Sequence, residues 1–158
     1  MIFTNIIHSP VGTVHLIAAI IAMITGLFVI LKGHKGNSSH KKIGYVYVVA
    51  MLFLNGTAFG IYNFGSFSMF HFFSVISLMS LTFGMLPMIL KWSNKIRFHY
   101  RFMSWSVVGL YAAFVAEVFT RFIRFEFFWV VVMIGTLLVS IVGGYLIEKN
   151  AKNFIKKF

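Results

Sequence analysis

The sequence predicts an all-α polytopic membrane protein, a four-helix up-down bundle plus a fifth transmembrane helix, in a single transmembrane domain over residues 1–158. Three observations predict this fold class. The chain is 59% hydrophobic and has only three acidic residues. Its mean hydropathy of +0.90 is too high for a soluble globular protein, in which about half of the residues are apolar. Its basic residues gather between apolar runs. Each apolar run is about 20 residues long, which is the length of a helix that crosses a bilayer.

The helix ends are predicted from capping and turn residues. Ser9 as N-cap and Pro10 at the first helical position favour a helix start. The second helix is expected to open at Ser38 or Ser39, before its apolar run, and Pro87 can kink the third helix near its end. The residues after 147 form a basic tail. The five predicted spans are 10–31, 43–62, 69–90, 98–122 and 127–147.

The distribution of Lys and Arg predicts the orientation in the membrane. Twelve of these residues lie in the segments expected on one side of the membrane: the first connector (32–42), the third connector (91–101) and the tail (149–157). The segments expected on the opposite side hold only Arg121 and Arg124. The positive-inside rule then places the N-terminus outside and the C-terminus in the cytoplasm. The net charge of +11 is therefore expected to serve topology, not nucleic-acid binding.

Missing features narrow the functions further. There is no cysteine, which excludes disulfides, thiolate ligands and covalently attached haem. The N-terminus has no basic region and no small-residue cleavage site after its first apolar run, so we expect a retained helix. Size and composition suggest an integral protein of a bacterial inner membrane. The lipid bilayer is its expected partner, and a homo-oligomer is allowed.

Four histidines are the candidate functional residues. His15, His40, His71 and His99 each lie near the start of a different apolar segment. Because successive helices alternate in direction, His15 and His71 are expected near the outer face, and His40 and His99 near the inner face. Helices one and three, and likewise two and four, are diagonal neighbours in such a bundle. Ionisable groups inside spans are costly and point to function.

Glu117 is a second unusual residue in an apolar span. It lies five helical turns, about 27 Å, beyond His99 and on the same helix face, which raises it to the predicted level of His15 and His71. Glu117 is a candidate catalytic carboxylate that accepts protons or contacts substrate. Alternatively, it pairs with Arg121 one turn away and stabilises the helix end.

This placement of one histidine on each of four successive helices resembles the transmembrane dihaem b-type cytochromes, which transfer electrons from ascorbate or quinol. The resemblance covers about residues 15–121. It implies two non-covalent haem b groups with iron ligated by His15/His71 and by His40/His99, and a quinol or another small reductant as donor. Such a protein would be a transmembrane oxidoreductase. The intervals between the histidines are shorter than that family leads us to expect.

A second resemblance names no activity. Residues 34–36 and 40–45, together with the pair His99 and Met103, look like those of a bacterial family of small integral membrane proteins of unknown function.

The same residues are also compatible with other functions. His15, His71 and Glu117 at one height could bind zinc with one position left for water, as in a membrane hydrolase. A haem sensor or carrier, or an accessory membrane subunit whose polar groups only join helices, would also fit the pattern.

Overall fold

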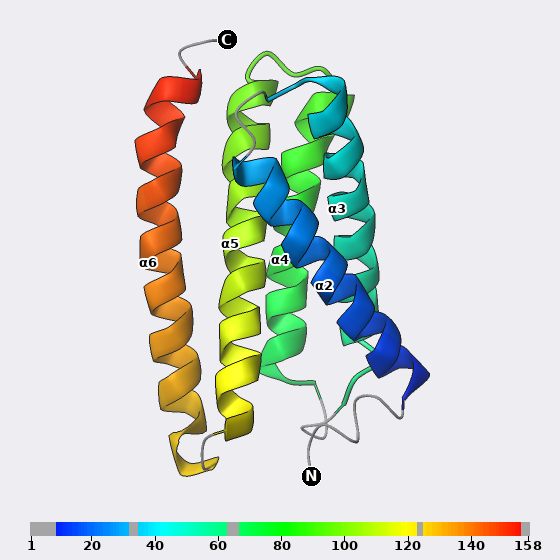
Figure 1. Ribbon diagram of the computed structural model, residues 1–158, viewed down its shortest axis with the longest axis vertical. Helices are drawn as coiled ribbons and strands as arrows, with labels where there is room; N and C mark the ends of the chain where they lie inside the picture. The colour runs from blue at the N-terminus through cyan, green and yellow to red at the C-terminus, as the bar shows by residue number, and fades with distance from the viewer. Residues whose placement is uncertain (1–8, 32–34, 63–66, 123–124, 156–158) are drawn as a thin grey trace. The chain divides into compact units, whose positions relative to one another are not determined.

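The structure is a computed structural model, and it describes residues 9–31, 35–62, 67–122 and 125–155 (Figure 1). Within these ranges the chain is helical and contains no strand, which confirms the predicted all-α class. The chain divides into two compact units, Met1–Leu78 and Met79–Phe158, and each is considered by itself. The elements are α2 (Pro10–Leu31), α3 (Ser38–Ala58), α4 (Met69–Ile89), α5 (Lys95–Phe122), η1 (Phe125–Phe127) and α6 (Phe128–Ile155).

The first unit is built on an antiparallel pair, α2 and α3, coloured blue and cyan in Figure 1. His15 of α2 contacts Thr57 near the end of α3, and a Cβ at Gly60 would lie 3.2 Å from Val11. The small residues of α2 are buried: Ala22 is fully inaccessible and Ala18 is 5% exposed. Small residues at these positions let the two helices approach closely.

Capping residues explain where α3 begins and ends. Asn37 is its N-cap, and its side-chain oxygen accepts the backbone N–H of His40 at 2.8 Å. The helix begins at Ser38, as predicted, but it ends at Ala58, four residues before the predicted end of the span. The Thr57 hydroxyl donates to the carbonyls of the preceding turn, and Gly60 closes a tight turn on the Thr57 carbonyl.

The second unit contains an antiparallel pair, α5 and α6, side by side in Figure 1. Glycines of α6 allow the close approach. A Cβ added at Gly143 would lie 2.5 Å from a methyl of Val108, and one at Gly144 would lie 3.2 Å from Trp105. Small residues serve this purpose in membrane helices, where packing replaces the hydrophobic effect as the cause of association.

The α6 helix continues two turns beyond its predicted end and includes most of the expected tail, so that boundary was wrong. Contacts with α5 explain the extension. The Tyr100 hydroxyl donates to the Ile147 carbonyl at 3.0 Å, Arg101 pairs with Glu148 at 3.1 Å, and Tyr100 stacks on Phe154. These contacts hold residues that the sequence had placed in a basic tail.

Among the residues that the structure describes, four helices are long and apolar enough to cross a membrane: α2, α4, α5 up to Phe119, and α6 up to Ala151. The α3 helix, predicted as the second span, is not among them. Its mean hydropathy is lowered by the polar first turn with Lys41 and Lys42 and by Asn55 near its end. The α4 helix continues to Ile89 past Pro87, and α5 begins a turn earlier than predicted, at Lys95. The predicted turn at 63–66 lies outside the described residues.

Candidate functional site

His15 is anchored between the two helices of the first unit. Its Nδ1 lies 3.0 Å from Oγ1 of Thr57. That hydroxyl can donate its single proton to the carbonyl of Phe53 at 2.7 Å or of Leu54 at 3.0 Å, and its oxygen then accepts from His15. In that arrangement the proton of the neutral imidazole is on Nδ1, and Nε2 carries the lone pair. This tautomer is the one that binds a metal through Nε2.

The tautomer of His99 is fixed by its partner. Its Nδ1 lies 2.9 Å from the carbonyl oxygen of Gly84, and a carbonyl can only accept, so Nδ1 donates. Gly84 is needed there because α5 lies close against α4. A Cβ at this position would lie 2.7 Å from the sulfur of Met103, one helical turn beyond His99. An Nδ1–H bond to a carbonyl is typical of histidines that ligate metals.

His71 has a different arrangement, because it caps its own helix. Ser68 precedes α4, and both its backbone N–H, at 3.0 Å, and its hydroxyl, at 2.9 Å, contact Nδ1 of His71. A side chain at the third helical position that accepts the N–H of the N-cap residue forms half of a capping box. Because the backbone N–H must donate, Nδ1 is an acceptor and the proton of neutral His71 is on Nε2.

The ring of His71 is buried among aromatic side chains. It is 2% exposed, with the rings of Tyr62 and Phe67 at 5.0 Å and that of Phe59 at 6.0 Å. Nε2 is buried and forms no hydrogen bond within the described part of the chain. An orphaned polar atom of this kind costs free energy unless a further group binds it.

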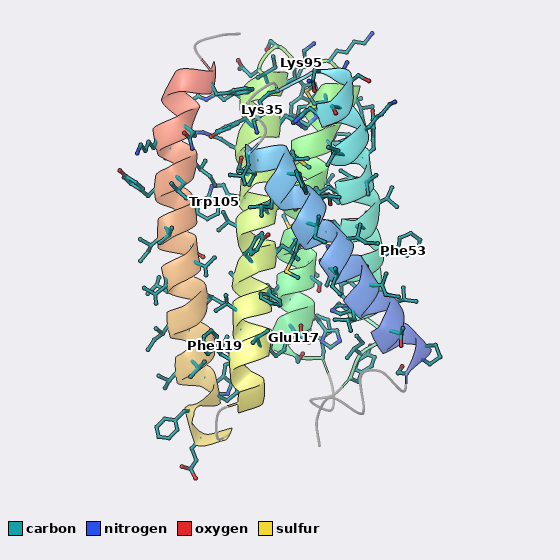
Figure 2. All side chains as sticks on the ribbon, in the orientation of Figure 1. Lys35, Phe53, Lys95, Trp105, Glu117 and Phe119 are labelled. Carbon is teal, nitrogen blue, oxygen red and sulfur yellow. The ribbon has the colours of Figure 1, made fainter. Side chains whose placement is uncertain are left out.

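The remaining candidate residues are His40 and Glu117. His40 is half-buried in the first turn of α3. Its pairing with His99 joins the two units and stays a prediction, as does the pairing of His15 with His71. Glu117 is an exposed residue of α5 (Figure 2), and the side chain of its expected partner Arg121 lies outside the described residues.

No three His, Cys, Asp or Glu side chains come together as a metal site within the described ranges. The three-residue zinc site of His15, His71 and Glu117 gains no support from this finding, whereas a haem iron held by two imidazoles needs no such cluster.

A comparison with protein families assigns the chain. A family model described as "predicted membrane protein (DUF2306)" matches residues 12–148, which is most of the chain. The protein belongs to the DUF2306 family. This confirms the resemblance to a membrane family of unknown function and leaves the cytochrome resemblance as a proposal. No curated protein and no solved structure matches the chain.

Three residues that matter at these histidines were missed by the sequence reasoning. Thr57 and Gly84 contact histidines 42 and 15 residues away, and no local pattern marks such pairs. Ser68 could have been found, because a Ser three residues before a side chain with an acceptor atom is the spacing of a capping box.

Proposed function

We propose that this DUF2306 protein binds haem within the membrane and transfers electrons. The observation that carries the proposal is the hydrogen bond from Nδ1–H of His99 to the Gly84 carbonyl on a neighbouring helix, which leaves on Nε2 the lone pair that an iron ligand requires. The contact of His15 Nδ1 with the Thr57 hydroxyl allows the same tautomer.

His71 fits the same role in its other tautomer. To bind iron through Nε2, its Nδ1 must carry the proton, and the Ser68 hydroxyl 2.9 Å away is the acceptor for it. The contact between Nδ1 and the Ser68 N–H would then be given up. The orphaned Nε2 and the aromatic rings around it suit an apolar, planar group.

The chemistry supplied by a bound haem is the uptake and release of single electrons. The residues of the chain would tune the reduction potential of the haem. The hydrogen bonds at Nδ1 of His15 and His99 increase the basicity of each imidazole, and the apolar helices exclude water. With one histidine pair near each face, as the sequence predicts, electrons would cross from a quinol or another small reductant to an acceptor on the opposite side.

The visible absorption spectrum of protein purified from haem-replete cells tests this function. We expect a Soret band and sharp α-bands on reduction, with two haems per chain. His15→Ala or His71→Ala should remove one haem, and His40→Ala or His99→Ala the other. His8→Ala, at a histidine that we expect to be solvated, is the control and should leave the spectrum unchanged.

A colourless protein with stoichiometric zinc would overturn the proposal in favour of the zinc hydrolase. Loss of the same chromophore in all four variants would contradict two separate sites. A spectrum that responds to haem but to no quinol or soluble reductant would indicate a haem sensor or carrier.

A further inference from the structure

An apolar groove of about 560 Å³ lies between residues 14–21 of α2 and 45–53 of α3. We call it the α2–α3 groove. Its lining is apolar except for the hydroxyl of Tyr45, and its volume falls in the range of small-molecule sites. Val49 and Phe53, the latter labelled in Figure 2, are more than half exposed. The groove is therefore open along α3.

The groove belongs to a part of the chain that is expected to lie in lipid. One wall is formed by α2, whose mean hydropathy of 2.7 is the highest among the candidate spans. A groove whose lining is apolar apart from the Tyr45 hydroxyl offers few hydrogen bonds to a polar ligand, but it accommodates a hydrocarbon chain.

Charge at one end of the groove determines which lipid it suits. Lys41 and Lys42 are both exposed, and they lie one helical turn before Tyr45 and Val46, so they extend the groove-lining face of α3. Residues 1–78 contain no Asp or Glu, so no carboxylate of this unit competes for them. Lys35, by contrast, donates to the carbonyls of Val29 and Ile30 at the end of α2.

We propose that the α2–α3 groove binds an anionic phospholipid. One acyl chain lies along the groove, and the phosphate contacts the ammonium groups of Lys41 and Lys42. The Tyr45 ring lies between the two parts, where an aromatic side chain with one polar end is favoured at a membrane interface. This site is independent of the histidines and of haem.

Native mass spectrometry of protein from mixed micelles tests the site, with phosphatidylglycerol and phosphatidylcholine of identical chains as probes. We expect one phosphatidylglycerol to be retained with a preference of about tenfold or more over phosphatidylcholine. Lys41→Gln/Lys42→Gln should abolish the preference. The control Lys91→Gln/Lys95→Gln removes the same charge from the second unit and should preserve it.

A second pair of variants tests the acyl chain. Val49→Phe narrows the groove and should reduce retention of phosphatidylglycerol, whereas Leu52→Phe, at a position of equal exposure outside the groove, should not.

Equal retention of both lipids by the native chain, or an equal loss in the two double variants, would overturn the proposal. So would a Val49→Phe variant that binds like the native chain, or spectra showing a second copy of the chain in place of lipid. The visible spectrum should not change in any of these variants, which separates this proposal from the proposed haem function.

Discussion

Ser68 offers Nδ1 of His71 both a donor and an acceptor, and only the acceptor is compatible with iron binding. Ser68→Ala removes the hydroxyl and leaves the backbone N–H, which keeps the proton on Nε2. We expect the haem assigned to His71 to bind about tenfold more weakly or worse, as is common when an outer hydrogen bond to a metal ligand is lost. Haem titration followed by absorption measures this change.

Ser68→Thr is the matched control, because it keeps the hydroxyl and should restore binding. The haem assigned to His99 should be unaffected in both variants. If Ser68→Ala binds haem as the native chain does, Ser68 has no part in setting the tautomer.

Lys35, outside the membrane spans, predicts a pH dependence of stability. Burial lowers the pKa of its ammonium group below the ordinary 10.5. Between the lowered pKa and 10.5, the unfolded chain holds a proton that the folded protein has released, so the free energy of unfolding rises with pH across this interval.

We therefore expect the native chain to gain stability relative to Lys35→Met as the pH increases from neutral to 10.5. Thermal unfolding in detergent measures the difference between the two proteins at each pH. A constant difference would contradict the linkage.

At the scale of elements, the contact between α5 and α6 depends on Gly143. A methyl group there would meet the side chain of Val108, so Gly143→Ala should destabilise the protein by about 1–3 kcal/mol through overpacking. Gly109→Ala is the control, because a Cβ at Gly109 meets no atom within 4 Å. Thermal unfolding of both variants checks this. Equal melting temperatures would mean that the two helices separate easily at this position.

Most helix bounds could be predicted from the sequence, including the ends of α2 and α5, but the ends of α3 and α6 could not. Pro10 and the polar residues around Ser38 mark starts with residues of known local geometry. The end of α6 depends on Tyr100 and Arg101, which are far away in the chain and contact Ile147 and Glu148 only after folding. The same holds for the candidate site: the histidines could be selected from the sequence, but the atoms that hold them come from other helices.

For the whole molecule, the orientation predicted from Lys and Arg can be tested without a background signal, because the chain has no cysteine. Single cysteines replacing Lys42, Phe67, Lys91 and Glu126 probe four successive connections. If all five helices cross, a membrane-impermeant maleimide should label only the Phe67 and Glu126 positions from outside. Labelling of Lys42 and Phe67 from the same side would show that α3, too polar to be counted among the candidate spans, does not cross.

Pro87 has a consequence for the segment of α4 that anchors His99. Proline has no N–H, so the carbonyl of Phe83 lacks its usual partner within the helix. The next carbonyl, that of Gly84, accepts from His99 of another helix. This turn of α4 therefore holds its backbone less firmly than the turns on either side. Its amide hydrogens should exchange with deuterium sooner than those of the neighbouring turns. Binding of haem iron to His99 should slow that exchange.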